Sequence, residues 1–297
     1  MVADGAAGAQ VGVRPRVAAR GVPAMGQDRG VVRTYGRGHF ALERVLAAKR
    51  GRTVTVCIPA HEEQATVGGV VRAVAGPHLA PGGSGLVDEV LVVDDGSRDA
   101  TAAAAAGAGA RVARHARRQG KGGAMATGLE QAAGDVLVFL DADVENTAPE
   151  FVTSLLGPVL CDDAALVKGY YARPLAGATT GGGRVTELMA RPVLEVLFPE
   201  LAEVRQPLAG ETAAPRWVLE KVGLAPGYGV EMALLIDVAT RLGTGSLAQV
   251  DLGTRVHRNR TLDQLRPQAV EVLRAALERA AAAGPQPAAE GGPGRGR

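Results

Sequence analysis

The sequence predicts an α/β fold built on an open, mostly parallel sheet with helices on both faces. The first observation is the order of segments: apolar runs typical of buried strands alternate with helical segments through the first half of the chain. The second is that polar residues stop the strands. The third is composition, because hydrophobic residues make up 46% of the 297 residues and can fill a large core. In such sheets ligands bind beyond the carboxyl ends of the strands, so we expect a site there.

The elements of the first half follow from hydrophobic spacing and from glycine-rich breaks. Residues 53–60 (TVTVCIPA) form a continuous Val-rich run, as expected for a strand buried on both faces. In residues 61–76 a loop leads into four valines at helical spacing. By the same criteria we expect further strands at residues 87–97, 111–115 and 135–143, and helices at residues 38–51, 98–110 and 120–134.

The second half of the chain is less regular. Strands are expected at residues 165–174 and 246–260, and loops that lead into helices at residues 179–201 and 225–243. The helix expected at residues 261–283 is amphipathic. Apolar positions near one face of it are Leu262, Leu265, Leu273, Ala276 and Leu277. That face can form the surface of the homodimer we expect, or it can pack on its own domain.

The two ends of the chain have the composition of tails. Residues 1–40 hold many arginines, few acids and much Gly and Ala, and we expect a disordered basic tail; Met25 is an alternative start to Met1. Residues 283–297 are rich in Gly, Pro and Ala and are expected to be disordered.

Composition also restricts the partners. Aromatic residues are only 3% and the net charge is +2, which argues against a nucleic-acid partner. We expect no membrane span, because no apolar run has the required length. Cys57 and Cys161 are isolated, and Cys57 lies in an apolar run where we expect it buried. They form neither a zinc pattern nor a disulfide framework, so a reducing cytoplasm is expected.

Acidic residues end two of the expected strands. Asp141 and Asp143 directly follow an apolar strand and offer hard oxygen ligands suited to Mg²⁺ or Mn²⁺, which can bridge the oxygens of a diphosphate. A solvated turn is the alternative, but the strand context favours the metal. Asp94 and Asp95 end another strand and point to recognition of a nucleotide base or ribose, against a plain turn or a helix cap near Ser97.

Basic and glycine-rich segments offer candidate anion sites. RRQGKGGAM can hold phosphate through backbone N–H groups and Lys121, although it lacks the pattern of a Walker A loop. GGGRVTE places Arg184 and the Thr186 hydroxyl at a helix start, which suits a phosphate or a carboxylate. PGYGVE places Tyr228 and Glu231 at another helix start. RVHRNR surrounds His257 with Arg255, Arg258 and Arg260, a candidate anion or metal site.

These segments, in this order, resemble a known family. The chain is similar to the nucleotide-sugar half of a GT-A glycosyltransferase, a Rossmann-like fold, in PAHEEQATVGGVV, VDEVLVVDDGSRD, GKGGAM and VFLDADV. It resembles the retaining glucosyl-3-phosphoglycerate synthases of actinobacteria more specifically in LVKGYYARP, GGGRVTELMARPVL, QPLAGE, APGYGVEMALLID and LGTRVHRNR. The resemblance covers residues 33 to about 280.

The resemblance implies an activity and a division of the chain. Members of this family transfer glucose from UDP-glucose to D-3-phosphoglycerate, an early step toward methylglucose lipopolysaccharides, with Mg²⁺ or Mn²⁺ as cofactor. Residues 41–160 would form the nucleotide-sugar-binding subdomain. Residues 161–282 would form a C-terminal acceptor-binding α/β part that includes the last helix.

The resemblance also implies residue roles. For the donor they are Pro59, Ala60 and Glu63 on the nucleoside, Asp95 and Lys121 near the base, and Asp141 and Ala142 at the diphosphate. Metal ligands would be Asp143 and His257. Phosphoglycerate would bind Gly183, Arg184, Thr186 and Asn259. Tyr228 and Glu231 would face the donor sugar and the reaction centre, with Glu231 and Asp143 as the catalytic residues.

The sequence departs from the family pattern at two positions, and the departure at Asp95 leaves the donor open. The glucosyl enzymes usually have D-S-G-S and D-S-D where this sequence has Asp95 and Ala142. Guanine offers adjacent N–H donors that suit a carboxylate such as that of Asp95, so GDP-mannose, as in mannosyl-3-phosphoglycerate synthases, is the alternative donor. A nucleotidyltransferase and a catalytically silent binding module are more distant alternatives. The first typically has a glycine-rich signature after the first strand, which PAHEEQ lacks.

Overall fold

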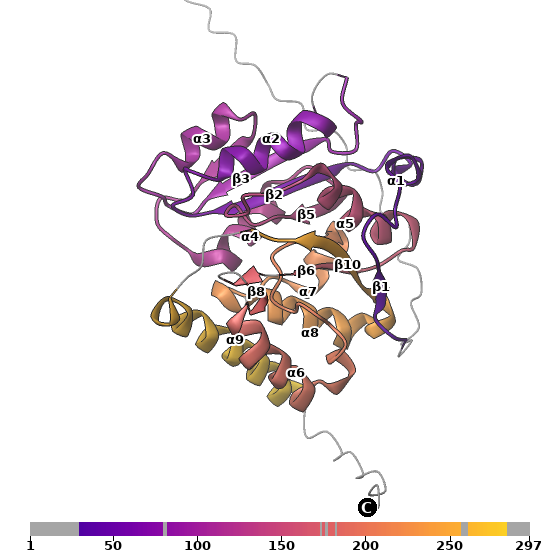
Figure 1. Ribbon diagram of the computed structural model, residues 1–297, viewed down its shortest axis with the longest axis vertical. Coiled ribbons are helices and arrows are strands. Elements are labelled where there is room, and N and C mark those ends of the chain that lie inside the picture. Colours follow the sequence, from indigo (N-terminus) through magenta and orange to yellow (C-terminus); the bar gives the residue numbers. More distant parts are fainter. Residues whose placement is uncertain are drawn as a thin grey trace, which may run out of the picture.

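The computed structural model describes residues 30–79, 82–172, 174–175, 178–181, 183–256 and 261–283. Within these residues the central feature is an eight-stranded sheet between layers of helices (Figure 1). Its strands are β1 (Arg33–Tyr35), β2 (Val54–Ala60), β3 (Glu89–Asp94), β4 (Arg111–Arg114), β5 (Val136–Phe139), β6 (Leu166–Ala172), β9 (Thr212–Pro215) and β10 (Leu247–Thr254). Two short strands, β7 (Pro174–Leu175) and β8 (Ala178–Gly181), pair with each other.

Helices cover both faces of the sheet. The first half contributes α1 (Leu42–Lys49), α2 (Val67–His78), α3 (Thr101–Gly107), α4 (Gly120–Gln131) and α5 (Pro149–Cys161). The second half contributes η1 (Thr186–Ala190), α6 (Arg191–Leu197), η2 (Pro199–Leu201), α7 (Arg216–Val222), η3 (Gly227–Gly229), α8 (Val230–Leu242), η4 (Thr244–Ser246) and α9 (Leu262–Ala283). In the described part of the chain, none of these helices is long and apolar enough to cross a membrane.

The two faces of the sheet belong to two hydrophobic cores. Along β2, Val56 and Ile58 pack with the helices α1, α2, α3 and α5, whereas Cys57 points to the opposite face and packs with α4 and α8. This alternation is the two-residue period of a strand, and it explains why a strand covered on both sides is apolar at every position. Cys57 is fully buried, as expected from the sequence. Figure 1 shows α2 and α3 on one side of the sheet and α6, α8 and α9 on the other.

The strand order is β1-β10-β6-β9-β5-β2-β3-β4. The strands are parallel except β9, which runs antiparallel to both of its neighbours, β5 and β6. The carboxyl ends of β2, β3, β5, β6 and β10 therefore meet at one edge, and the amino end of β9 reaches the same edge from the opposite direction. This topology brings residues from both halves of the chain to a single edge of the sheet.

The predicted fold class, a mostly parallel sheet with helices on both faces, is confirmed. Two strands differ from the sequence analysis. Residues 33–35, placed there in the N-terminal tail, form β1, which pairs with β10. The four residues of β9 (TAAP) were not recognised, because Ala and Pro have little strand propensity. In both cases pairing with distant segments, and not local preference, makes the strand.

Candidate active site

A cleft of about 790 Å³ opens at the carboxyl edge of the sheet, and the predicted site residues converge on it. Those that line it are Pro59, Ala60, Glu63, Asp95, Lys121, Asp141, Ala142, Asp143, Gly183, Arg184, Thr186, Tyr228 and Glu231. The other two predicted residues, His257 and Asn259, lie outside the described residues. The expected donor-side and acceptor-side residues therefore share one cleft.

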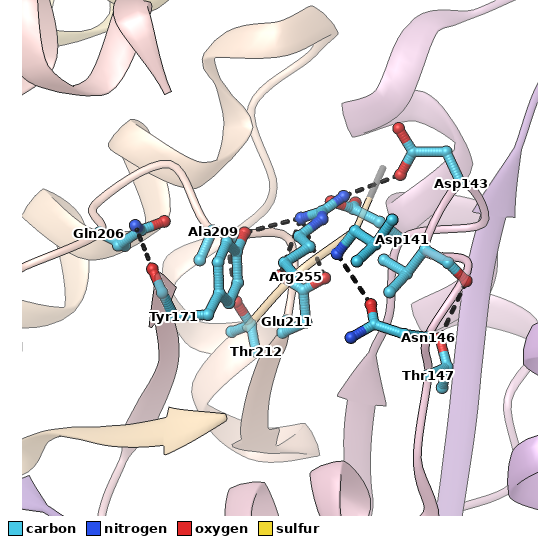
Figure 2. A network of polar contacts seen from close by, with 12 residues as sticks. Asp141, Asp143, Asn146, Thr147, Tyr171, Gln206, Ala209, Glu211, Thr212 and Arg255 are labelled. Carbon is cyan, nitrogen blue, oxygen red and sulfur yellow. Dashed lines mark hydrogen bonds and ion pairs between the residues drawn. The ribbon is translucent and has the colours of Figure 1, made fainter. Parts of the chain in front are cut away.

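Arg255, which directly follows β10, is the centre of a polar network in this cleft (Figure 2). Its side chain is only 4% exposed. Nη2 donates to Asp141 Oδ2 at 2.9 Å and to Asp143 Oδ1 at 2.8 Å. Nη1 donates to Tyr171 Oη at 2.6 Å and pairs with Glu211 Oε1 at 3.1 Å. Burial alone opposes the positive charge, but the neighbouring acids and the tyrosine raise the pKa of Arg255 well above its ordinary value.

Lys121, near the start of α4, joins the two acids on either side of it. Nζ donates to Asp141 Oδ1 at 2.6 Å and pairs with the carboxylate of Glu231 on α8. Burial opposes ionisation of Asp141, but Lys121 and Arg255 hold the pKa of its carboxyl well below its usual range. Asp141 is therefore ionised at neutral pH, with both oxygens engaged by protein cations.

The loop before β9 approaches these acids so closely that only glycine fits. A Cβ built on Gly210 would lie 2.0 Å from Asp141 Oδ1, well inside van der Waals contact. The next residue is Glu211, the partner of Arg255. The antiparallel course of β9 is what delivers this loop to the carboxyl edge.

Lys168 on β6 holds the loop before β9 in place through hydrogen bonds. It is buried, and Nζ donates to the Ala209 carbonyl oxygen at 2.5 Å and to Thr212 Oγ1 at 3.1 Å. Burial is the largest influence and lowers the pKa of Lys168 to about 8, although the nearby acids Glu231 and Glu211 partly oppose this. Lys168 lies inside an apolar strand pattern, so no sequence motif marks it as a site residue.

The two loops that follow β2 and β3, where the nucleotide is expected, are joined by hydrogen bonds. Glu62 has a left-handed backbone with φ of 58°, and its N–H donates to Ser97 Oγ at 3.0 Å. Its carboxylate accepts the Arg98 N–H at 2.8 Å, and Glu63 N–H donates to Thr101 Oγ1 at 2.8 Å. Ser97 thus links the β2–α2 and β3–α3 loops, a role different from the helix cap considered from the sequence.

Tyr228, in the turn η3, is positioned from both sides. Its hydroxyl accepts from Arg118 Nη2 at 3.1 Å, and its backbone N–H donates to Glu271 Oε2 on α9 at 2.6 Å. The helix α9 packs on η3 and α8 and buries Val272 and Ala276. The last helix is therefore part of the wall of the cleft, and its Gln264 and Gln268 line it.

The residues predicted to bind the acceptor lie where a helical segment begins. Gly183 has φ of 78°, a backbone conformation that glycine adopts without strain, and the chain turns helical from Arg184 into η1 and α6. Thr186 is buried at the wall of the cleft, and η1 is a π-helical turn, a feature often found at functional sites. The N–H groups at this helix start, with Arg184, suit an anion.

Comparison with known proteins identifies the family. Residues 55–181 match the protein family described as "Glycosyl transferase family 2". The glucosyl-3-phosphoglycerate synthase of Mycolicibacterium paratuberculosis is 45% identical over 263 residues, covering 83% of this chain and 78% of the relative. That of Mycolicibacterium smegmatis is 46% identical, with 83% and 84% covered. The chain belongs to the glucosyl-3-phosphoglycerate synthase family.

Solved structures of a glucosyl-3-phosphoglycerate synthase give the same answer for the fold. The Mycobacterium tuberculosis enzyme in complex with Mn²⁺, UDP-glucose and phosphoglyceric acid has a TM-score of 0.77 and 43% identity, covering 84% of this chain and 88% of that chain. Its complex with Mg²⁺ and UDP has a TM-score of 0.77 and 42% identity, covering 84% and 87%. The GT-A fold expected from the resemblance is therefore confirmed.

The described residues of this family member fit a divalent cation. Asp143 uses Oδ1 for Arg255, and its Oδ2 has no hydrogen-bond partner in the described part of the chain. Four carboxylates, those of Asp141, Asp143, Glu211 and Glu231, face three cationic side chains, so a cation is attracted electrostatically. No group of three or more His, Cys, Asp or Glu side chains forms a metal cage among the described residues. The donor set suits Mg²⁺ or Mn²⁺ that takes its other ligands from a diphosphate.

Proposed function

We propose that this protein transfers glucose from UDP-glucose to D-3-phosphoglycerate, releasing UDP and forming glucosyl-3-phosphoglycerate with retention of anomeric configuration. The observation that carries the proposal is the single cleft that joins the Asp141 and Asp143 carboxylates to the Arg184 segment. Related structures from Mycobacterium tuberculosis contain UDP-glucose, phosphoglyceric acid and the product glucosyl-3-phosphoglycerate. Family membership removes the nucleotidyltransferase and the silent module as alternatives.

The structure does not support the argument that favoured GDP-mannose as the donor. It rested on a free carboxylate at Asp95 that would accept guanine N–H groups. Both oxygens of this carboxylate already accept protein N–H groups, from His115 and from the backbone of Gln119 and Gly120. UDP-glucose is therefore the donor we propose.

The donor would lie along the carboxyl edge, with the nucleoside at Pro59, Ala60 and Glu63. Mg²⁺ or Mn²⁺ would be held by Asp143 together with His257, and when bound it would neutralise charge on the diphosphate and stabilise it as a leaving group. Arg255 donates to Asp143 Oδ1 and so places a fixed guanidinium next to this metal site. Its charge would favour the negative charge that grows on the departing phosphate.

The acceptor would bind with its anionic groups at Gly183, Arg184 and Thr186, together with Asn259. Its hydroxyl would then point toward the donor sugar, which Tyr228 and Glu231 would face. Lys121 holds the Glu231 carboxylate in place, so Glu231 can orient hydroxyl groups of the sugar. We propose that the acceptor hydroxyl attacks from the face that the diphosphate leaves, and that its proton passes to the departing phosphate.

We also propose that the protein acts as a homodimer. Among the described residues, six of the eight exposed large hydrophobic side chains lie on η1, α6 and α9. They are Leu188, Val196, Leu262, Val270, Leu273 and Leu277. The helices α6 and α9 lie against each other (Figure 1). We propose that the six side chains share one surface over these helices, called here the α6–α9 face. Contiguous apolar surfaces of this kind mark association sites, and a two-fold axis lets one face serve both copies.

The cellular setting is a further proposal. Both cysteines of the chain, Cys57 and Cys161, are free in the structure, as in proteins of reducing compartments. We propose that the reaction takes place in the cytoplasm and supplies an early intermediate of methylglucose lipopolysaccharide synthesis, as the family resemblance implies.

The test of the proposed function is a donor panel. The full chain is incubated with Mn²⁺ and either UDP-glucose or GDP-mannose, with and without D-3-phosphoglycerate, and nucleotide release and product mass are measured. We expect UDP release and a glucosyl-phosphoglycerate product only when UDP-glucose, acceptor and metal are all present. Faster turnover of GDP-mannose, or release of pyrophosphate, would contradict the proposal.

A further inference from the structure

The carboxylate of Asp95 is turned into the protein, although its backbone lies at the nucleotide side of the cleft. The residue is 3% exposed. Oδ1 accepts the Gln119 N–H at 2.7 Å, and Oδ2 accepts the Gly120 N–H at 2.8 Å. These two amides belong to the N-cap and to the first residue of α4, immediately before Lys121. The carboxylate thus holds the backbone that carries this lysine.

His115 extends the contact to the body of α4. Its Nδ1 lies 2.7 Å from Asp95 Oδ1, and its Nε2 lies 2.8 Å from Thr127 Oγ1, in the middle of α4. A carboxylate only accepts hydrogen bonds, so Nδ1 carries the proton, and in the neutral ring Nε2 accepts the threonine hydroxyl. The His115 side chain is only 7% exposed, so loss of either partner would leave a polar nitrogen without a hydrogen bond.

The backbone that this network holds has little freedom of position. A Cβ on Gly122 would lie 1.9 Å from the Ala225 carbonyl oxygen, and one on Gly120 would lie 3.3 Å from Gly227 Cα. The start of α4 therefore packs backbone to backbone against the segment that leads to Tyr228. A small displacement of the β4–α4 loop would move Lys121 from Asp141 and Glu231 and would disturb the turn η3.

We propose that Asp95, His115 and Thr127 form a buried brace that positions Lys121, and that the brace sets the affinity of the site for the nucleoside diphosphate and not for the phosphoglycerate. This deepens the proposed function and rests on it. Asp95 and His115 are positioning residues in this scheme, because they act through the loop and through Lys121. Groups that hold a binding residue in place contribute to affinity by removing the need to order it.

The test combines two variants of the full chain with two measurements. Asp95→Asn replaces one acceptor oxygen by an NH₂ group that faces N–H donors, and Thr127→Val removes only the hydroxyl that pairs with His115. We expect amide hydrogen exchange at residues 119–124 to be at least about tenfold faster in Asp95→Asn and about twofold to threefold faster in Thr127→Val. By calorimetry with Mn²⁺, the Kd of UDP should rise in the same order, while the Kd of 3-phosphoglycerate stays within about twofold.

Matched controls separate positioning from general stability. His78, the last residue of α2, is also a buried histidine and does not line the cleft. Its Nδ1 hydrogen-bonds with Ser84 Oγ, and its Nε2 hydrogen-bonds with the Pro149 carbonyl oxygen. Asp135 also accepts a backbone N–H, that of Thr53, at the opposite edge of the sheet. His78→Gln and Asp135→Asn should lower the melting temperature without changing either Kd.

Three outcomes would overturn the brace: unchanged exchange at residues 119–124, an unchanged Kd of UDP in Asp95→Asn, or equal losses of UDP and phosphoglycerate affinity. Failure of the wild-type protein to transfer glucose would contradict the proposed function. The comparison of exchange rates and of UDP affinity among the variants would still decide the brace.

Discussion

At the scale of single residues, the site depends on charges that are buried together. Arg255 reaches Asp141, Asp143 and Glu211 within hydrogen-bond distance while almost fully buried. Charges taken out of water are costly unless they are paired, so removing any one of them leaves its partner uncompensated. Each residue of this network therefore affects both the geometry of the site and the stability of the fold.

Asp143→Ala should abolish metal-dependent turnover, because it removes the carboxylate that has an oxygen available for a cation. We expect kcat/KM for UDP-glucose to fall on the order of 10²–10³-fold in Mn²⁺. The matched control is Glu145→Ala, an exposed acid two residues further on, which should keep full activity. Normal, metal-stimulated activity of Asp143→Ala would disprove the metal assignment.

Lys168 should give the protein a distinctive alkaline stability profile. Its pKa in the folded protein is about 8, below the ordinary 10.5, so the unfolded chain binds more protons between these two values. Stability then rises as pH increases through this window. Relative to Lys168→Met, the wild-type free energy of unfolding should increase by about 2 kcal/mol from pH 7 to pH 9.5.

Denaturant titrations of both proteins at several pH values measure this difference. The comparison cancels the contributions of groups that do not interact with Lys168. A difference between the two proteins that does not vary with pH would contradict the assignment.

At the scale of elements, β9 determines how the two halves of the site meet. It has four residues, yet it lies between β5 and β6 and connects the strands β2 to β5 with β6, β10 and β1. Because it is antiparallel, the loop before it, and not the loop after it, lies at the carboxyl edge. Only for this reason does Gly210 come close to Asp141 and Glu211 pair with Arg255.

Gly210→Ala should damage the site through a steric contact. The new Cβ would lie 2.0 Å from Asp141 Oδ1, so the loop or the carboxylate must move. We expect a loss of about 1–3 kcal/mol of stability and at least about a tenfold loss of kcat/KM. Gly69→Ala on α2, where a Cβ meets nothing within 4 Å, is the control and should keep wild-type activity. Equal activity of the two variants would show that the close approach has no catalytic consequence.

At the scale of the whole molecule, the α6–α9 face predicts association. Leu273→Glu combined with Leu277→Glu should place charges in the proposed interface and shift the protein from dimer to monomer, as measured by sedimentation at several concentrations. Val31→Glu alters an exposed apolar residue outside this face and should leave the mass unchanged. A wild-type protein that sediments as a monomer at micromolar concentration would refute the dimer.

The sequence was most informative where local pattern and burial agree. The sequence correctly predicted the positions of β2, of the acids after β5 and of the glycine-rich start of α4. These features follow from the two-residue period of a strand and the 3.6-residue period of a helix, which neighbouring residues determine. The sequence was less informative for Asp95. A carboxylate after a strand suggests a ligand, but only the folded loop shows that His115, Gln119 and Gly120 use both of its oxygens.

By itself, the sequence determined the α/β class, the order of most strands and helices, the family and the residue types of the cleft. All of these properties depend on periodicity and on short motifs, and both are set by residues close together along the chain. Only the tertiary structure decided that β1 and β9 exist, that Arg255 joins three acids, and that Lys168 lies beneath the loop before β9. Each of these depends on contacts between segments far apart in the sequence, and on burial, which changes the energy of a charge without changing any local pattern.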